Sequence, residues 1–367
     1  MRERIDAASL RTFSEALCCA AGLSTPDAAL LSDSIVFAEC RGVTSHGLLR
    51  LPQYIARLRS GATAMNVSMP FTMESGGTAR LDAQNGLGQL AGRKAAAKAE
   101  ELAGEYGVSF VAVANSNHFG TGAWYAIPAA QRGFFAFNIS SAASAMAPHG
   151  AAQPLLGTDP IGLALPRGEG KTPLALDMAL STVARGKIRY AALSGTPIPD
   201  TWGLDAHGAP TTDASAVLRG GTLLPAGGAK GSGLAIFIEL LCAVLTGSSA
   251  LGGAGLLSDL SRPAGTGHVF GCVDISAFCR SKPLRSCARR ASRASPLSPR
   301  RSRAARFCSP ASRRSAVPPR ALLTACRSLR RFAMRSTRSP KSSAARHDSE
   351  SDILNPLYIL EGGRIPP

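Results

Sequence analysis

The chain has 367 residues, of which 45% are apolar, so it is long enough to bury one large or two moderate hydrophobic cores. Its net charge of +17 comes from the last quarter, because residues 280–367 hold 21 Lys and Arg against 4 Asp and Glu. Residues 1–279 hold 20 Lys and Arg and 20 Asp and Glu, so this part of the chain has no net charge. That balance excludes a nucleic-acid-binding protein whose basic residues are spread over the whole chain.

Neither an apolar N-terminal segment nor an unbroken run of about 18 apolar residues is present, so we expect a cytoplasmic protein without a membrane span. The 9 cysteines include no CxxC pair and are odd in number. They favour reduced thiols over a disulfide framework or a zinc site, and no bound metal is expected.

Two helices are predicted near the N-terminus, over residues 7–22 and 25–41. The first follows from apolar residues at helical spacing, and the second from a capped start with a proline just inside it. A glycine at position 42 is suited to end the second helix.

The next stretch, residues 41–54, gathers chemically able side chains. His46 can exchange a proton near neutral pH, Ser45 can orient its ring, and Arg50 has the planar fork that suits a carboxylate. If a helix begins near Ser45, His46, Arg50 and Tyr54 share one face, although Pro52 is comfortable only near a helix start. The spacing suits the handling of a 2-hydroxy or 2-keto acid; the alternative is an exposed helix start with scattered polar residues.

Strands and helices alternate in the rest of the orderly sequence. Strands are predicted at 79–83, 108–114, 134–140, 161–165, 174–178 and 267–275, and helices at about 92–104, 123–132, 182–193 and 232–245. The last helix is apolar nearly all round and is therefore expected to be buried.

Two glycine-rich stretches invite a phosphate-binding interpretation, and neither has the required spacing. Residues 85–92 read G-x-G-x-x-x-G, one residue too long for a Rossmann fingerprint, and the strand after them ends without an acid for a ribose. Residues 224–231 place a lysine at a helix start but are not a P-loop. Residues 115–126, small and polar between a strand and a helix, let a ligand approach backbone N–H groups. There His118 could protonate a substrate, contact a nicotinamide or simply cap the helix.

Residues 1–275 resemble the malate/L-lactate dehydrogenases of the second, non-Rossmann type, a family that includes ureidoglycolate, sulfolactate and Δ1-piperideine-2-carboxylate enzymes. Six motifs carry the resemblance in family order. They are RGVTSHGLLRLPQY (41–54), NSNHFGTGAWY (115–125), MAPHGAAQPLLGTDPIG (146–162), LDMALSTVARGKI (176–188), IPDTWGLDAHGAPTT (198–212) and LPAGGAKGSG (224–233).

The resemblance implies an α/β subunit with the two-domain malate/L-lactate dehydrogenase-like fold and a non-Rossmann NAD(P)-binding domain, usually homodimeric. Residues 1–75 would form a helical substrate and dimer part, and residues 76–275 an α/β part for cofactor binding and catalysis. The implied reaction is hydride transfer between NAD or NADP and C2 of a small 2-hydroxy acid, such as malate or lactate, or its keto or imino counterpart.

Carried over by position, the resemblance makes His46 the proton donor or acceptor, with Ser45 in a relay. Arg50, Tyr54 and Thr158 become the substrate contacts. The cofactor residues would be His118, Phe119, Gly120, Thr121, Gly122, Ser140, Asp177, Met178, Ala179, Ala229 and Lys230.

At three positions the resemblance does not assign one clear role, because members of the family differ there or because this sequence has another residue. His118 is itself the acid/base in some members; we favour His46 for the proton and His118 for the cofactor side. Lys187 stands where some members have a relay aspartate, which leaves the relay partner open. Asp159 stands where the family usually has asparagine.

The pattern ends near residue 278, and residues 276–367 form a basic Arg/Ser/Ala/Pro-rich tail. Residues 280–347 contain no Asp or Glu and show no apolar periodicity, which predicts disorder if the tail is genuine. A genuine tail could bind nucleic acid on a vestigial dehydrogenase domain. We favour a frameshift in a GC-rich gene, because the change in composition falls between a strand and the helix that should follow it. Such a frameshift would remove part of the cofactor site and could leave the protein inactive.

Overall fold

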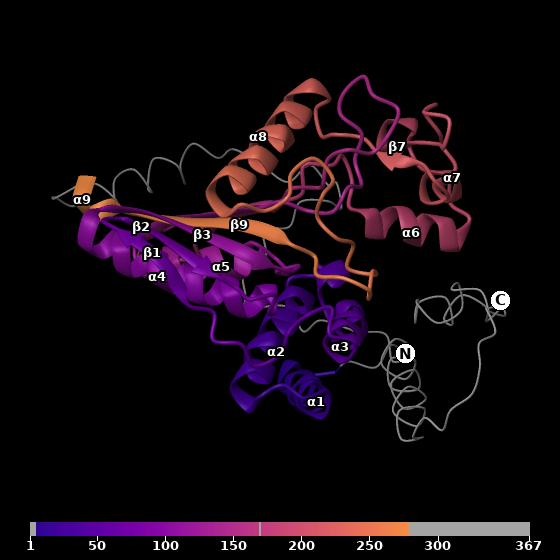
Figure 1. The fold of residues 1–367 in the computed structure, drawn as a ribbon. Coiled ribbons are helices and arrows are strands. Elements are labelled where there is room, and N and C mark those ends of the chain that lie inside the picture. Colours follow the sequence, from indigo (N-terminus) through magenta and orange to yellow (C-terminus); the bar gives the residue numbers. More distant parts are fainter. Residues whose placement is uncertain (1–4, 169, 279–367) are drawn as a thin grey trace.

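The structure is a computed structural model that describes residues 5–168 and 170–278, so the predicted tail lies outside the described residues except for its first three. Its centre is a seven-stranded mixed sheet in the order β1-β2-β3-β9-β4-β5-β6 (Figure 1). The strands are β1 (Phe71–Ser75), β2 (Thr78–Asp82), β3 (Val108–Ser116), β4 (Phe134–Ser140), β5 (Ile161–Leu165), β6 (Leu174–Met178) and β9 (Thr266–Asp274).

Only β2 and β3 pair in parallel; the other neighbours in this sheet are antiparallel. A Rossmann sheet is built from parallel βαβ units, so this topology agrees with the expected non-Rossmann α/β fold. The late strand β9 lies between β3 and β4, and it therefore holds the two halves of the sheet together.

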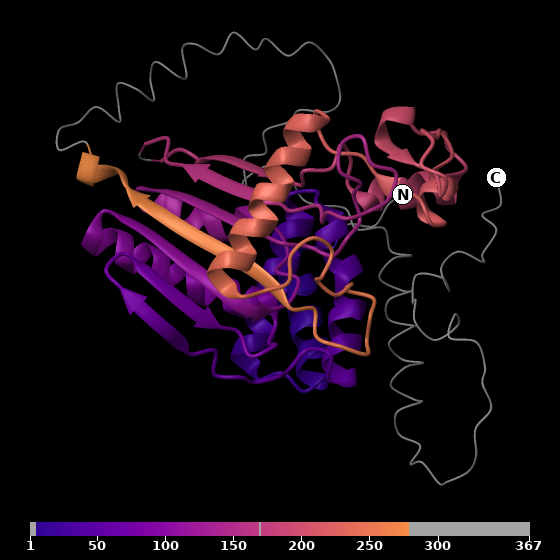
Figure 2. The same ribbon diagram turned by 45° about the horizontal axis from the view of Figure 1, so that its top comes forward.

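Helices cover both faces of the sheet. Helices α4 and α5 lie on one face and α8 on the other, while α1–α3 and the α6–α7 region stand at the end where β3 and β4 finish (Figures 1 and 2). The helices are α1 (Ala7–Ala20), α2 (Thr25–Cys40), α3 (Leu51–Ser60), α4 (Gly88–Tyr106), α5 (Ala123–Gln131), α6 (Arg185–Ser194), α7 (Ala214–Leu218), α8 (Ala229–Thr246) and α9 (Ile275–Phe278).

Three buried apolar clusters hold these layers together. The largest joins α4 and α5 to the sheet, the second joins α1, α2 and α3, and the third joins α6, α7 and α8 to the other side of the sheet. A second, two-stranded sheet of β7 (Gly203–Leu204) and β8 (Thr222–Leu223) belongs to the α6–α7 region.

Most predicted elements are present with small shifts of their ends, and α2 begins at its predicted cap, where the Ser24 hydroxyl accepts from the Asp27 N–H. The condition that a helix begins near Ser45 is not met. Two short 3₁₀ turns, Thr44–His46 and Leu48–Arg50, precede α3, which starts at Leu51 with Pro52 in its first turn. Strand β1, the short β7–β8 sheet and helix α7 were not predicted.

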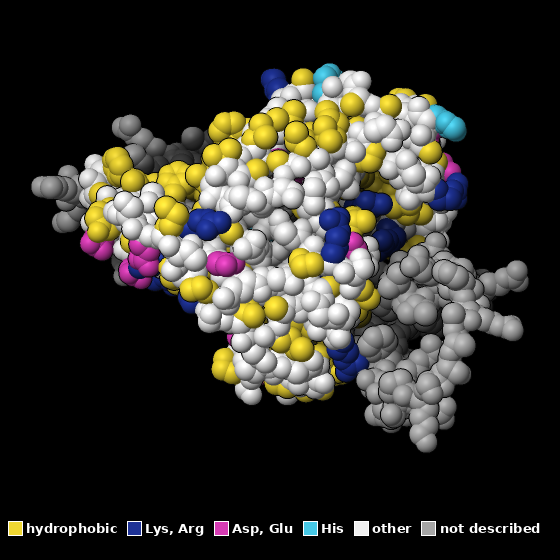
Figure 3. Space-filling model, in the orientation of Figure 1, with side chains coloured by type: hydrophobic (Ala, Val, Ile, Leu, Met, Phe, Trp, Pro, Cys, Tyr) yellow, Lys and Arg dark blue, Asp and Glu magenta, His cyan; other side chains and the backbone are white. Residues whose placement is uncertain are grey.

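Helix α8 is only partly buried, contrary to expectation. Among its outward side chains, Phe237 is 62% and Val244 is 81% exposed, and apolar side chains gather along it in Figure 3. By length and composition alone α8 is also apolar enough to cross a membrane, although Lys230, Ser232 and Glu239 interrupt its apolar sequence. Its inner side includes the buried Ala235, Ile238 and Cys242.

Candidate active site

One large cavity, of about 1030 Å³, opens where the 41–50 segment, the turn after β3, the end of β4, the β5–β6 hairpin and the start of α6 meet. This volume is at the upper end of the range for small-molecule sites. Figure 3 shows Lys and Arg side chains gathered in a hollow beside α6. The predicted site residues that line the cavity are Ser45, His46, Arg50, His118, Phe119, Gly120, Thr121, Ser140, Thr158, Asp177, Met178 and Ala179.

His46 and His118 lie together although 72 positions separate them in the sequence. Their rings stack with centroids 5.4 Å apart and planes 20° from parallel. The Ser45 hydroxyl lies 3.0 Å from His46 Nδ1, which leaves Nε2 as the ring nitrogen free to meet a ligand. Burial, together with the nearby Arg50 cation, lowers the pKa of His46 to about 4, so this imidazole is neutral at physiological pH.

The tautomer of His118 follows from its two neighbours. Tyr54 Oη lies 2.7 Å from His118 Nδ1, and the Gly120 backbone N–H donates to the same nitrogen at 3.4 Å. A backbone N–H can only donate, so Nδ1 is the unprotonated nitrogen, the Tyr54 hydroxyl donates to it, and Nε2 carries the proton. Burial, with the neighbouring His46 ring and the Arg50 cation, lowers the pKa of His118 well below its ordinary value.

Arg50 is anchored on one side and faces the cavity on the other. Its Nε donates to the Ser45 carbonyl at 2.8 Å and its Nη1 to Gln53 Oε1 at 2.8 Å. No carboxylate pairs with it among the described residues. An uncompensated guanidinium beside a neutral imidazole is suited to receive a ligand carboxylate.

The rest of the cavity lining consists mostly of small and apolar residues with a few polar groups. Asp177 accepts a hydrogen bond of 2.9 Å from the Ala123 N–H at the start of α5. Thr121 Oγ1 is buried and has no hydrogen-bond partner in the described part of the chain. Two cations, Arg167 and Lys171, line the cavity from the β5–β6 hairpin.

Five of the predicted site residues do not line the cavity. Tyr54, 2% exposed, reaches it only through His118. Gly122 is required by packing, because an added Cβ would lie 2.6 Å from Asn138 Oδ1. Lys187 is an exposed residue of α6, and Ala229 and Lys230 stand at the start of α8.

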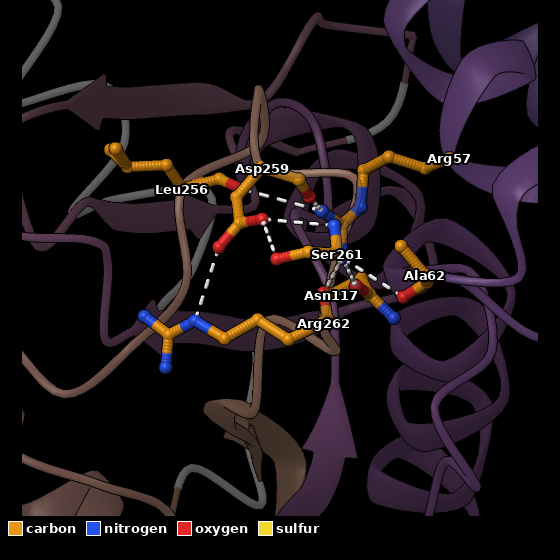
Figure 4. A network of polar contacts seen from close by, with 7 residues as sticks. All are labelled: Arg57, Ala62, Asn117, Leu256, Asp259, Ser261 and Arg262. Carbon is orange, nitrogen blue, oxygen red and sulfur yellow. Dashed lines mark hydrogen bonds and ion pairs between the residues drawn. The ribbon is translucent and has the colours of Figure 1, made fainter. Parts of the chain in front are cut away.

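Arg57 of α3, which no motif drew attention to, fixes one wall of the cavity. It is 1% exposed, and its guanidinium donates to the carbonyl oxygens of Leu256 (3.3 Å), Asp259 and Arg262 (3.1 Å) (Figure 4). Its Nη2 also donates to Asn117 Oδ1 at 3.1 Å. One side chain therefore ties the loop between α8 and β9, several of whose residues line the cavity, to the residue before His118.

His268 of β9 was also missed by the sequence reasoning. It is fully buried, with Nδ1 2.8 Å from Ser140 Oγ and Nε2 2.8 Å from Ser116 Oγ, and it stacks on Phe119. Burial lowers its pKa to about 3, so it is neutral and joins the ends of β3, β4 and β9 beneath the cavity. The sequence signal that could have identified His268 is the presence of a histidine in a predicted strand that is otherwise mostly apolar.

Asp159, the departure from asparagine, is fully buried beside Glu239. Burial and the Glu239 carboxyl group raise the pKa of Asp159 to about 9, so it is a neutral acid at physiological pH. Its Oδ1 accepts from the Ala142 N–H at 3.1 Å, while Glu239 accepts from the Gly157 N–H at 2.6 Å. This pair of acids underlies the turn that brings Thr158 to the cavity.

Comparison with known proteins gives the same picture at the level of the whole chain. The family model described as malate/L-lactate dehydrogenase matches residues 5–317, and so runs past the last recognised motif. The chain is 41% identical to the NADP(+)-dependent (2R)-3-sulfolactate dehydrogenase of Chromohalobacter salexigens, over 68% of this chain and 74% of that protein. It is 36% identical to the NAD(+)-dependent ureidoglycolate dehydrogenase of Escherichia coli K12, over 66% of this chain and 69% of that one.

The fold matches as well. The solved structure of sulfolactate dehydrogenase from Methanocaldococcus jannaschii superposes with a TM-score of 0.73 at 32% identity, covering 79% of this chain and 83% of that one. The comparisons give no support to the nucleic-acid alternative. The chain therefore belongs to the malate/L-lactate dehydrogenase family, a family of NAD(P)-dependent dehydrogenases that act on the CH–OH group of small hydroxy acids.

Proposed function

We propose that this protein interconverts a small 2-hydroxy acid and its 2-keto acid, with His46 exchanging the hydroxyl proton and Arg50 binding the carboxylate. One observation carries the proposal. A neutral imidazole with one free nitrogen lies beside an arginine that has no carboxylate partner among the described residues, and both line the same cavity. A proton acceptor next to a carboxylate anchor is the arrangement that this reaction needs.

The lining residues also fit a nicotinamide dinucleotide. Thr121 offers a buried hydroxyl without a partner in the described part of the chain, Ser140 and Asp177 offer polar atoms, and Arg167 and Lys171 offer cations for phosphates. We propose that these residues, with Met178 and Ala179, hold the cofactor. When bound, NAD(P)⁺ accepts the hydride that leaves C2 with the electron pair of the C–H bond.

His46 receives the proton in the oxidation direction. The hydroxyl O–H breaks as the C2–O bond becomes a carbonyl, and the proton goes to His46 Nε2. The resulting positive charge lies close to Arg50, which opposes it, and close to the substrate carboxylate, which favours it. Because Nε2 accepts the substrate proton, Nδ1 already carries the proton of the neutral ring and donates it to the Ser45 hydroxyl oxygen at 3.0 Å. Transfer of this Nδ1 proton to Ser45, with loss of the Ser45 hydroxyl proton to the next acceptor, would be the first step of a relay.

His118 has a different role. Its Nδ1 already accepts from Tyr54 and Gly120, so the ring offers a donor at Nε2 and cannot take up the substrate proton without losing these bonds. We propose that it donates a hydrogen bond in the cavity and supports the His46 ring by stacking. Tyr54 fixes this tautomer; it is a positioning residue.

The proposal is tested by steady-state kinetics on a panel of 2-keto acids with NADH and with NADPH, for the wild type, His46→Gln and His118→Gln. We expect His46→Gln to lower kcat by roughly 10²- to 10⁴-fold while cofactor binding, followed by nicotinamide fluorescence, is retained. If His118→Gln alone abolishes turnover and His46→Gln does not, the two roles are exchanged.

We further propose that the sequence after residue 278 results from a change of reading frame. Its support is the abrupt switch from balanced charge to an acid-free stretch over residues 280–347. Translation of the gene in the two other frames near codon 279 should restore acidic residues and helical periodicity. If neither frame does so, the tail is genuine.

A further inference from the structure

We infer that Arg185 and Arg189 of α6, acting beside Arg50, form a second anion-binding subsite, so that the substrate is a 2-hydroxy acid with a second acidic group, a carboxylate or a sulfonate. The inference rests on the proposed function for the chemistry at C2. The binding of a dianion does not depend on that chemistry and can be measured separately.

The start of α6 lies against the proton-transfer residues. A Cβ added to Gly186 would come within 3.3 Å of the Ser45 Cβ, so the first turn of the helix is in contact with Ser45. Arg185, the residue before it and the first of α6, lines the cavity together with Ser45, His46 and Arg50. A group held by Arg185 would therefore belong to the same ligand as a carboxylate held by Arg50.

Arg189 adds to the positive charge of this end of the cavity. It follows Arg185 by four residues, so the two side chains share one face of α6. Burial lowers the pKa of Arg185 and of Arg50, and the charge of Arg189 lowers both further. Arg189 itself does not line the cavity, so it acts on a ligand through its charge.

No acid balances the three arginines within the described residues. None of the ion pairs includes Arg50, Arg185 or Arg189, and the acid among the residues lining the cavity is Asp177, which receives the Ala123 N–H. The N-cap residue of α6, Ala184, makes no side-chain hydrogen bond to the helix start. One carboxylate on Arg50 would leave the charge on α6 unpaired, whereas a second acidic group would pair it.

Binding is tested on the full-length protein with non-reactive ligands. Malonate, sulfoacetate and acetate are titrated by calorimetry against the wild type, Arg185→Gln, Arg189→Gln and Arg219→Gln. Arg219 is a matched control, because it is an exposed cation of the neighbouring α7 region, paired with Asp213 at 3.6 Å and absent from the cavity.

The two dianions should bind the wild type and Arg219→Gln at least roughly tenfold more tightly than acetate does. This preference should fall to about threefold or less in Arg185→Gln and to an intermediate value in Arg189→Gln. Whether malonate or sulfoacetate binds more tightly decides between carboxylate and sulfonate. Equal affinity of the wild type for dianions and acetate would overturn the inference.

A kinetic arm separates this inference from the proposed function. With oxaloacetate and 3-sulfopyruvate, Arg185→Gln should lose roughly tenfold to a hundredfold in kcat/KM, a loss at least about tenfold larger than the loss with pyruvate. The control Arg219→Gln should leave kcat/KM for all three keto acids, and the KM for NADH and NADPH, unchanged. A raised cofactor KM with no loss of selectivity would assign Arg185 to the cofactor phosphates and overturn the subsite. Dianion-selective binding without turnover of any keto acid would sink the proposed reaction and leave the subsite standing.

Discussion

The two walls at the His46 end of the cavity differ in how their polar groups are satisfied. On the wall of residues 41–57 and 116–120, Ser45 contacts His46, Tyr54 holds His118, and Arg57 ties Asn117 to the loop between α8 and β9. On the α6 wall, Arg185 and Arg189 have no such partners among the described residues. Side chains that are already held in place suit the proton-transfer step, which is the same for each substrate. Arginines without a partner suit the selection of one substrate over another, because a ligand group can pair with them.

Removing the proton acceptor should have the largest effect on the wall of residues 41–57 and 116–120. Glutamine at position 46 keeps a similar shape and hydrogen-bonding capacity but cannot accept the hydroxyl proton, which is the reason for the roughly 10²- to 10⁴-fold loss of kcat proposed above. The comparison is sharpened by measuring malonate binding in the same variant. Affinity within about threefold of the wild type would show that the two walls act separately, and a parallel loss would contradict that division.

Arg57→Leu should be the next most disruptive change. It leaves the carbonyl oxygens of Asp259 and Arg262 without the Arg57 donor, while the Leu256 carbonyl keeps only the Asp259 N–H. Each acceptor left unsatisfied costs about 1–3 kcal/mol. Chemical denaturation should report the loss of stability, and kinetics a raised KM, because residues of that loop line the cavity.

Arg57→Lys is the companion variant, since lysine restores the charge without the planar fork. It should recover part of the stability that Arg57→Leu loses, but its KM should stay close to the raised KM of Arg57→Leu. If Arg57→Lys is fully active, or if Arg57→Leu changes stability with KM and kcat untouched, Arg57 has no positioning role at the site.

The pH dependence of oxidation tests the charge state of His46. The folded pKa, about 4, lies below the ordinary value near 6.5, so the neutral base persists until the pH falls through about 4. We expect kcat/KM for hydroxy-acid oxidation to be level above about pH 5.5 and to fall below it. Because the Arg50 cation contributes to this shift, Arg50→Gln should move the midpoint upward; a midpoint near 6.5 in the wild type would contradict the assignment.

Tyr54→Phe should have a smaller effect. It removes the hydroxyl that donates to His118 Nδ1 but keeps the ring, which is packed in the core at 2% exposure. We expect kcat to fall by about tenfold with little change in stability, since only one hydrogen bond is lost. Nitrogen chemical shifts of the His118 ring should then show a mixture of tautomers, and an unchanged single tautomer would show that Tyr54 does not fix it.

The sequence predicted the elements better than it predicted the contacts between them. Caps and periodicity located α2, α4 and most strands, because these signals are local. The pairing of Tyr54 with His118 depends on how α3 meets the turn after β3, and Arg57, on the same helix, resembles an ordinary surface cation in sequence. Helix α8 was expected to be buried because it is apolar all round, yet composition does not show how many sides of a helix are covered.

Asp159→Asn tests the turn that carries Thr158, whose carbonyl accepts from the Leu180 N–H ahead of α6. Asp159 keeps its proton in the folded protein up to about pH 9 but loses it near 4 when unfolded, so the wild type loses stability as the pH rises between these values. An amide cannot ionise and can donate permanently to Glu239, so the variant should be more stable by about 1–3 kcal/mol at pH 8. Thermal unfolding at pH 4 and pH 8 checks this, because the difference should nearly vanish at pH 4; an equal difference at both values would mean that Asp159 does not hold the proton.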